Sequence, residues 1–448
     1  MTINANEGRQ DMSTALLTDM YEYTMLDAAL QDGTADRRCV FEVYTRRLPA
    51  GRRYGVVAGT GRLMEAIRAF RPTQDDLRFL ADRHIVSQPT LKWLESYRFS
   101  GSIRGYREGE TFFPNSPILQ VEGSFAECTL LETLILSILN YDSAVASAAS
   151  RMVSAANGRP CMDMGARRAN EWAAVSAARS AIVGGFTGTS NLQAAKFYDL
   201  PAIGTAAHCF TLLHDCERDA FVSQIQAFGK NTTLLTDTYS IEEAVKTAVE
   251  VAGPDLGGVR IDSGDLASLA QRVRNQLDAL GARKAKITVT NDLDEYAIAS
   301  LQNAPVDSYG VGTQLVTGSG APTCSMVYKL VEREGSDGSM VPVAKRSPNK
   351  ASVPGRKLAF RSYEYNLASA EHVISGSEGA LNTFQAPDDW RDLLVSYMDR
   401  GEANPEFLGH DALMRARDHR AQSLAELPIG AMSLMNGEPV IPSLEQML

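Results

Sequence analysis

The sequence lacks several features that would place it in a class at once. Its 448 residues carry a net charge of −10, so there is no basic excess to cover a nucleic acid or an anionic membrane. The six cysteines form no CxxC pair and give no sign of a disulfide framework or a zinc site, so we expect reduced thiols. The apolar run at 127–141 is interrupted by Glu127 and Glu132, and the N-terminus shows no basic and then apolar leader. We therefore expect a cytoplasmic protein that acts on small molecules and binds neither nucleic acid nor membrane.

Two common catalytic motifs are also missing. The HExxH spacing of metalloproteases does not occur, and we predict no metal held by protein ligands. The GxxxxGK[ST] loop is absent as well, which excludes a P-loop nucleotide site. What remains is an ordinary globular composition, 44% hydrophobic and 22% charged, in a chain long enough for about two or three domains.

A repeated pattern fills the chain from about residue 158 to 330. Short apolar runs each end in a polar or glycine-rich turn and are followed by a helical stretch, at the spacing of βα units. The runs are CMDMG (161–165), AIVGGFTGTSN (181–191), PAIGTAAH (201–208), TLLTDTY (233–239), GVRIDSGD (258–265), KITVTND (286–292) and DSYGVGT (307–313). The helix predicted after Asp265 has leucine and valine at steps of three and four, with Gly281 as its C-cap. Such strands form either a doubly wound sheet or a closed barrel, and periodicity does not separate the two.

Polar residues gather at the ends of these runs, which is the catalytic edge of a βα barrel. Arg260 and Asp262 alternate with Val259 and Ile261, so the two charged side chains share one face of their strand. One interpretation is a buried ion pair, and the other is a cation for an anionic substrate beside a carboxylate for sugar hydroxyls. Asp265 is predicted to cap the following helix.

The last two runs end in further candidates. Gly310 and Gly312 with Thr313 form a backbone that can approach a phosphate and offer amide groups to it, at a position where βα barrels often bind phosphate. Asn291 is a candidate for substrate binding. Its neighbour Asp292 lies three residues before a glutamate, which predicts a capping box.

His208 closes the run PAIGTAAH, among small residues. A lone histidine near apolar residues is most often a core residue, but the glycine and alanines beside it leave space around the ring. A neutral imidazole used as a nucleophile needs its other nitrogen oriented by a carboxylate. Asp237, at the end of the next strand, is the natural candidate. We interpret His214, expected at the start of a helix, as an ordinary polar residue.

Together these motifs resemble the nicotinate phosphoribosyltransferases, type II phosphoribosyltransferases of NAD salvage. The resemblance covers most of the chain, with ten motifs in family order. They are LLTDMYEYTM (16–25), GARRA (165–169), GGFTGTSN (184–191), GTAAH (204–208), DTYS (237–240), VRIDSGDL (259–266), NDLDE (291–295), GVGT (310–313), VYKLVE (327–332) and PGRK (354–357).

The resemblance implies an ATP-assisted condensation of nicotinate with 5-phosphoribosyl 1-pyrophosphate, giving nicotinate mononucleotide and pyrophosphate. The family histidine that matches His208 is phosphorylated by ATP, and the carboxylate that matches Asp237 orients it. ATP is thus a co-substrate, and Mg²⁺ is bound mainly through pyrophosphate and ATP. The resemblance also implies a homodimer with shared active sites, in which Tyr21 of the partner subunit packs on the pyridine ring.

The remaining site residues are also implied by the resemblance. Thr205 and Arg260 contact nicotinate, Asp262 lies near the ribose hydroxyls, and Thr313 with Gly310 and Gly312 holds the ribose 5-phosphate. The predicted substrate-binding set is completed by Asn291, Arg167 and Ser190.

Two positions bear on the choice of substrate. Met164 stands where the family commonly has an aromatic residue under the pyridine ring, and its thioether can still contact that ring favourably. Nicotinamide phosphoribosyltransferases carry an aspartate where this chain has Ser190, and a carboxylate there would repel nicotinate. Quinolinate phosphoribosyltransferase, a shorter chain without the phosphorylated histidine, fits less well. A catalytically silent nucleotide-binding protein on the same scaffold is the alternative from another class, and the intact set of charged residues argues against it.

The expected fold is α/β, an irregular TIM-like βα barrel of about seven strands with an α+β N-terminal domain and a mostly helical C-terminal segment. We expect the N-terminal domain at 1–140, completed by C-terminal residues, and the barrel with the active site at 141–357. Helical patterns in DDWRDLLVSYMDRG and HDALMRARDHRAQSLAEL predict the helical segment at 358–448.

Overall fold

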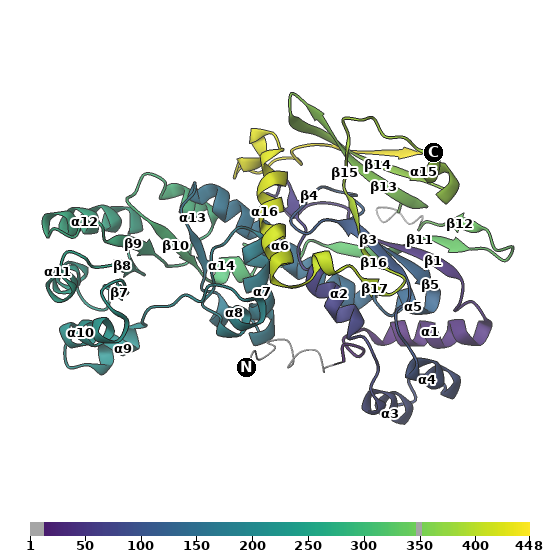
Figure 1. Ribbon diagram of the computed structural model, residues 1–448, viewed down its shortest axis with the longest axis horizontal. Helices are drawn as coiled ribbons and strands as arrows, with labels where there is room; N and C mark the ends of the chain where they lie inside the picture. The colour runs from purple at the N-terminus through teal and green to yellow at the C-terminus, as the bar shows by residue number, and fades with distance from the viewer. Residues whose placement is uncertain (1–12, 346–351) are drawn as a thin grey trace. The chain divides into compact units, whose positions relative to one another are not determined.

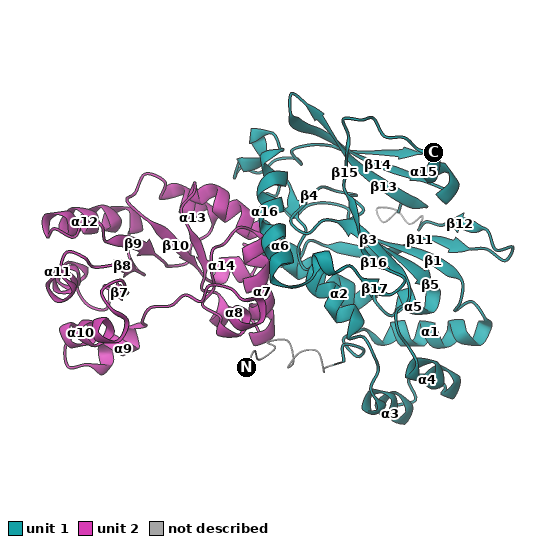
Figure 2. Cartoon of the chain, in the orientation of Figure 1, with its two compact units in different colours: residues 1–147, 321–448 teal, residues 148–320 magenta. Residues whose placement is uncertain are grey.

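The computed structural model describes residues 13–345 and 352–448, traced in Figure 1. These residues form two compact units, coloured separately in Figure 2. Unit 1 takes both ends of the chain, up to Ser147 and from Ala321 onward, whereas unit 2 is the middle of the chain, Ala148–Gly320. No helix in the described part of the chain is both long and apolar enough to cross a membrane.

Unit 1 is organised around a seven-stranded sheet with the order β12-β11-β1-β5-β3-β16-β17. Its strands are β1 (Arg38–Thr45), β3 (Ser102–Tyr106), β5 (Leu119–Ser124), β11 (Met326–Glu334), β12 (Met340–Pro342), β16 (Leu394–Asp399) and β17 (Glu402–Ala403). β1 pairs antiparallel with both β5 and β11, and every residue of β1 after Arg38 is buried. Residues 321–357, which we expected in the barrel domain, therefore supply two strands to this sheet.

The C-terminal part of unit 1 adds a four-stranded sheet with the order β15-β13-β14-β18. Its strands are β13 (Arg356–Glu364), β14 (Leu367–Gly376), β15 (Arg391–Asp392) and β18 (Ser443–Met447), and a separate pair is formed by β2 (Gly55–Val56) and β4 (Thr111–Phe112). β13 and β14 form a hairpin whose turn residues, Tyr365 and Asn366, have φ of 52° and 64°. These positive angles match the right-handed twist of a two-residue hairpin loop.

The expectation of a mostly helical segment at 358–448 is wrong. DDWRDLLVSYMDRG contains β15 and β16, because the segment pairs with β3 and β13 and this pairing overrides the helix-like spacing of its apolar residues. Only its later half is helical as expected, in α16 (Gly409–Ala425). The other short helices here are α15 (Glu378–Thr383), η2 (Pro405–Phe407) and η3 (Ile429–Met432).

The helices of unit 1 come mostly from the first third of the chain. They are α1 (Met20–Asp32), α2 (Thr60–Arg68), α3 (Gln74–Asp82), α4 (Gln88–Glu95), α5 (Phe125–Thr129) and α6 (Glu132–Ala156), of which α6 continues into unit 2. Each short helix buries one apolar side, as α2 does with Leu63, Met64 and Ile67. α3 starts with a complete capping box between Thr73 and Asp76.

Unit 2 contains five parallel strands in the order β6-β10-β9-β8-β7. They are β6 (Cys161–Asp163), β7 (Thr233–Leu235), β8 (Gly258–Ile261), β9 (Lys286–Val289) and β10 (Ser308–Val311). The helices between and around them are η1 (Ala166–Arg168), α7 (Glu171–Val183), α8 (Leu192–Tyr198), α9 (His208–Leu213), α10 (Glu217–Phe228), α11 (Ile241–Ala252), α12 (Leu266–Ala279), α13 (Glu295–Ser300) and α14 (Thr313–Val316). α12 has the predicted cap, since the Asp265 carboxylate accepts a hydrogen bond from Ser268 N at 3.2 Å, and Gly281 beyond its end has φ of +85°.

Two of the seven expected strands are reduced to single bridges. Thr189 bridges in parallel to Asp163 and to Ala202, while the residues 181–183 that we expected to open a strand are the end of α7. The reason is the glycine-rich sequence after residue 183, which supports a turn rather than a ladder. In the described residues no ladder joins the segment 201–208 to β7. We call this gap between segment 201–208 and β7 the seam.

Candidate active site

The loops after the parallel strands carry most of the predicted site residues. Parallel strands end at one edge of a sheet, so the loops that follow β7, β8, β9 and β10 meet there. Figure 1 shows these strands together in unit 2, and α10 contacts β7 where Gln224 Nε2 donates to Thr233 O at 3.0 Å. The segment 204–208 reaches the same edge through side chains that cross the seam.

His208 and Asp237 form the first of these contacts. His208 is the first residue of α9, and its Nε2 lies 3.1 Å from Oδ1 of Asp237 in the loop after β7. The carboxylate is only 2% exposed, whereas the imidazole is 42% exposed. An ionised carboxylate can only accept a hydrogen bond, so this contact assigns the ring proton to Nε2 and leaves the lone pair on Nδ1.

Asp237 is held from its other side by the loop after β8. Its Oδ2 accepts hydrogen bonds from Asp262 N at 3.0 Å and from Ser263 Oγ at 2.7 Å. The Thr290 hydroxyl, after β9, donates in turn to the Asp262 carboxylate. Three consecutive loops are thereby linked into one hydrogen-bonded chain that ends on the imidazole of His208.

Arg260, on β8, is the cation of the site. Its Nη1 donates to Thr205 Oγ1 at 2.8 Å and its Nη2 to Ala206 O at 3.1 Å, whereas its buried Nε has no hydrogen-bond partner. Burial lowers the pKa of Arg260, the nearby Asp262 offsets this in part, and the positive charge of Arg167 lowers the pKa further. Arginine stays protonated in proteins, so the site holds two neighbouring positive charges, and in the described residues no carboxylate forms an ion pair with Arg260.

The glycine-rich turn follows β10. Gly310 is the third residue of that strand, Gly312 precedes α14, and Thr313 is the first residue of α14. A Cβ at Gly310 would lie 2.6 Å from Met164 Sδ and 2.6 Å from Thr290 Cγ2, which is too close for any side chain. The absence of a side chain at residue 310 is therefore what lets β6, β9 and β10 present Met164, Thr290 and the turn side by side.

Asn291 and Asp292 both adopt left-handed backbone angles, with φ of 101° and 46°. The predicted capping box at Asp292 is wrong, because this left-handed turn delays the helix and Asp294 caps α13 by accepting from Ala297 N at 2.7 Å. Asn291 is exposed beside the site edge. His214, expected at a helix start, instead follows the end of α9 and has its Nδ1 2.8 Å from Phe210 O.

The other predicted residues lie on separate loops. Ser190 follows the bridge at Thr189, and its backbone N donates to Asp163 O at 2.8 Å. Arg167 is exposed on η1. Tyr21 is the one predicted site residue that belongs to unit 1, where it lies on α1 with 45% of its surface exposed. Burial, followed by the charge of Glu132, raises the pKa of Tyr21 to about 12.

Several residues of the site were not predicted from the sequence. Ser263 and Thr290 hold the two aspartates, yet a serine or threonine in a turn gives no signal of its own. Glu217 is the first residue of α10, and its Oε1 is buried without a hydrogen-bond partner. Burial, and then the nearby charge of Asp237, raise the pKa of Glu217 to about 7. In sequence, an acidic residue in a first helical turn indicates only a favourable interaction with the helix dipole.

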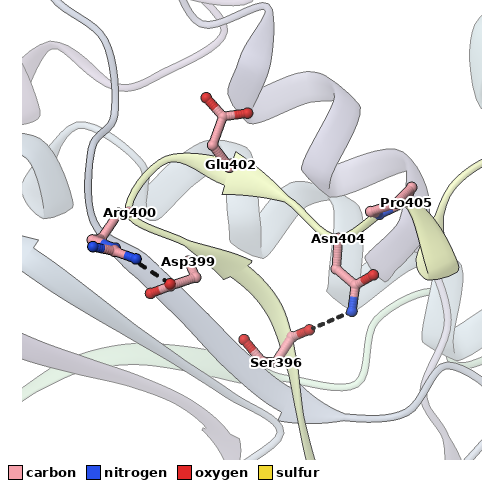
Figure 3. Close-up of a pocket in the computed structure, with 6 residues that line it drawn as sticks. All are labelled: Ser396, Asp399, Arg400, Glu402, Asn404 and Pro405. Atoms are coloured by element: carbon pink, nitrogen blue, oxygen red, sulfur yellow. Dashed lines mark hydrogen bonds and ion pairs between the residues drawn. The ribbon is translucent and has the colours of Figure 1, made fainter.

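A cavity of about 640 Å³ lies elsewhere, in unit 1, at the β16–β17 hairpin. Figure 3 shows two pairs in its polar lining: Arg400 is paired with Asp399, and the Asn404 amide donates to Ser396 O at 3.3 Å. None of the predicted site residues lines it. Within the described ranges, no three histidine, cysteine or acidic side chains gather as a metal-ligand group.

Comparisons with known proteins find relatives that match nearly the whole chain. A model of the nicotinate phosphoribosyltransferase N-terminal domain matches residues 16–140, and a model of the nicotinate phosphoribosyltransferase family matches residues 160–353. The nicotinate phosphoribosyltransferase pncB1 of Mycobacterium tuberculosis is 51% identical, with 98% of this chain and 97% of that protein covered. The nicotinate phosphoribosyltransferase of Bacillus subtilis is 37% identical over 86% of this chain and 79% of its own length.

A solved structure shows the same fold. The crystal structure of human nicotinic acid phosphoribosyltransferase matches with a TM-score of 0.81 at 25% identity and covers 96% of this chain and 98% of its own. These similarities define a phosphoribosyltransferase enzyme of NAD biosynthesis. The chain belongs to the nicotinate phosphoribosyltransferase family.

Proposed function

We propose that this chain condenses nicotinate with 5-phosphoribosyl 1-pyrophosphate to nicotinate mononucleotide and pyrophosphate, assisted by ATP through a phosphohistidine at His208. The observation that carries the phosphohistidine is the contact between His208 Nε2 and Asp237 Oδ1 at 3.1 Å. The names of the relatives support the substrates.

The geometry favours Nδ1 of His208 as the phosphate acceptor. Because Nε2 carries the proton and donates it to Asp237, the lone pair of Nδ1 is the nucleophile. In the transfer, Nδ1 forms a bond to the γ-phosphorus of ATP and the bond from that phosphorus to the bridging oxygen breaks, with ADP leaving. Asp237 then stabilises the positive charge that develops on the ring. Its bonds from Asp262 N and Ser263 Oγ keep it in place during this step.

The cationic part of the site fits the nicotinate carboxylate. Arg167 is close enough for its charge to lower the pKa of Arg260, and the Thr205 hydroxyl is already held by Arg260. Ser190 adds no negative charge, which favours the acid over the amide as substrate. Tyr21 of the partner subunit is proposed to cover the pyridine ring opposite Met164, which requires a homodimer.

The turn after β10 fits the other substrate. The backbone at Gly310, Gly312 and Thr313 is proposed to hold the ribose 5-phosphate, with Asn291 beside it and Asp262 near the ribose hydroxyls. Cleavage of the bond from C1 to pyrophosphate gives C1 oxocarbenium character, and nicotinate nitrogen then forms the new bond. Mg²⁺, which would be held mainly by the phosphate oxygens of the substrates and not by protein ligands, would supply positive charge to the leaving group.

The strand order supports the barrel interpretation of unit 2. Except at the seam, each parallel segment pairs with the one that follows it along the chain, and β10 returns to β6, which is the order of a βα barrel. We propose an irregular barrel of about seven parallel segments, of which two are single bridges and whose one gap is the seam.

The test is the reaction itself. The purified chain should form nicotinate mononucleotide from nicotinate, phosphoribosyl pyrophosphate and Mg²⁺, and ATP should increase the yield. Product from nicotinamide but not from nicotinate would overturn the substrate, and no product from either would favour a silent nucleotide-binding protein.

The phosphate acceptor has a separate test. H208A should abolish transfer of ³²P from γ-labelled ATP to the protein, while H214A should label normally, because the partner of His214 Nδ1 is the neutral carbonyl Phe210 O, which cannot stabilise a charged ring as the Asp237 carboxylate can. Label retained in H208A would place the phosphate on another residue.

A further inference from the structure

A buried carboxylate that no predicted role uses lies at the end of β6. Asp163 is 1% exposed, and in the part of the chain that the structure describes it has no ion-pair partner. Its two oxygens accept from two different loops, Oδ1 from Gly165 N at 2.8 Å and Oδ2 from Thr189 Oγ1 at 2.6 Å. Burial without a cation raises the pKa of Asp163, so the protein bears a cost at this position that packing alone does not explain.

Asp163, Thr189 and Asn191 form a short chain of hydrogen bonds, which we call the relay. The contacts of Thr189 fix the direction of these bonds. Thr189 Oγ1 donates to Asp163 and accepts from Asn191 N at 3.0 Å, so its single proton is committed to the carboxylate. Asn191 in turn caps α8 by accepting from Ala194 N at 3.0 Å. Ser190 stands between these two tied residues, and its own N donates to Asp163 O.

The Gly165 side fixes the other loop. Gly165 opens the turn that leads through η1 to Arg167, and a Cβ at residue 165 would meet the Val316 side chain and lie 3.0 Å from Gly312 O. Met164 N donates to Val311 O at 2.8 Å, which ties the same turn to β10. One carboxylate therefore sets the start of the loop that carries Met164 and Arg167 and the turn that carries Ser190.

We propose that Asp163 and Thr189 are positioning residues that hold these two loops, residues 164–168 and 188–191, in the arrangement that binds nicotinate. This inference rests on the proposed function, which assigns Met164, Arg167 and Ser190 to the nicotinate side of the site. Neither Asp163 nor Thr189 touches the substrate. Their effect reaches the substrate through the backbone of the two loops.

The relay predicts how substitutions rank. T189V keeps the shape of the side chain and removes both hydrogen bonds, whereas T189S keeps the hydroxyl. D163N keeps the acceptor for Gly165 N but turns an N–H toward Thr189 Oγ1, so the Thr189 hydroxyl proton loses its acceptor. S180A is the matched control, because Ser180 is a fully buried hydroxyl of the same unit that bonds only within α7, to Ser176 O.

The experiment measures kcat and the KM of each substrate for the four variants, with amide hydrogen exchange of both loops. T189V and D163N should raise the KM for nicotinate by about tenfold, leave the KM for phosphoribosyl pyrophosphate nearly unchanged and speed exchange at residues 164–168 and 188–191. T189S and S180A should match the wild type in both measurements.

Three results would overturn the inference. The first is a lowered melting temperature in T189V with an unchanged KM for nicotinate, which would make the relay structural only. The second is an equal rise in both KM values. The third is exchange at the two loops that does not change. A wild-type protein inactive on nicotinate would instead refute the proposed function, while the exchange measurement would still decide whether the relay orders the loops.

Discussion

Two arginines, one in each unit, show what the molecule does with buried positive charge. Arg361 in unit 1 is fully buried and donates to Glu110 at 2.6 Å and to Glu371 at 3.0 Å. Burial by itself lowers its pKa, but the two carboxylates outweigh burial and raise it. Arg260 in unit 2 is half-buried and bonds only to neutral oxygens, and its pKa is lowered.

This difference distinguishes charges that stabilise the fold from charges that are available to bind a ligand. In unit 1 Arg361 has its counter-charges within the chain, and so does Arg391, the second arginine on Glu110. In unit 2 the cation has no carboxylate partner, and the imidazole has one nitrogen without a bond, at an edge open to solvent. A charge that the fold leaves uncompensated is stabilised by binding an ion of opposite sign, and nicotinate and the phosphates are such ions.

The largest effect is expected from removing the charge of Asp237, in unit 2. D237N should reduce ³²P transfer to His208 on the order of a hundredfold or more, because the amide can donate to Nε2 and so moves the ring proton to the nucleophilic Nδ1. The melting temperature should change little. D265N is the control, since Asp265 lies in the next loop and only caps α12. Labelling of D237N at the wild-type rate would show that Asp237 does not set the tautomer.

The second largest effect is expected from removing a buried counter-charge, Arg361, in unit 1. R361M leaves Glu110 and Glu371 buried with one counter-charge fewer, and it should lower the free energy of unfolding by about 3–5 kcal/mol in urea denaturation. The KM values of the protein that remains folded should not change. R78M removes an exposed ion pair with Asp75 and should cost less than about 1 kcal/mol. An altered KM for nicotinate in R361M would mean that the two kinds of charge are not separate.

The smallest expected effect is the contribution of Glu217, in unit 2, to the pH dependence of stability. The folded pKa of Glu217 is about 7 against an ordinary 4.5, so between these values the folded chain holds a proton that the unfolded chain has released. Glu217 therefore lowers stability as pH rises from about 4.5 through about 7, and E217Q should abolish that part of the decline. The unfolding of unit 2 alone in urea can be followed by fluorescence in a W93F/W390F background. Of the three tryptophans, only Trp172 then remains. Parallel pH profiles with and without Glu217 would contradict the assignment.

Local pattern was enough to predict much of unit 2. The spacing of apolar residues predicted α12, and the alternation of Val259 and Ile261 with Arg260 and Asp262 agrees with the burial of β8. His208 and Asp237 are 29 residues apart, yet their positions at the ends of two consecutive expected strands were sufficient to predict that they meet. These predictions succeeded because each depends on a strand or helix and its immediate end.

Non-local pairing could not be predicted in the same way. β16 looked helical because its partner, β3, lies about 290 residues earlier in the sequence, and the spacing of apolar residues does not reveal a partner. The cap of α13 moved from Asp292 to Asp294 because two residues in a row took left-handed angles, which their side chains permit but do not require. We predicted a strand for the run that contains Asp163. The role proposed for Asp163 depends on Thr189, which contacts it from another loop.

The seam gives the active-site segment a freedom that the strands of unit 2 do not have. A strand in a ladder can shift only by breaking several backbone hydrogen bonds together. Segment 204–208 instead contacts the loop after β7 through His208 and Asp237, and it contacts β8 through Arg260, which donates to Thr205 Oγ1 and to Ala206 O. Under the proposed function, His208 takes up a phosphoryl group and releases it in every cycle. Because it lies on a stretch held by a few exchangeable contacts, His208 can then change partners while the strands of unit 2 keep their register.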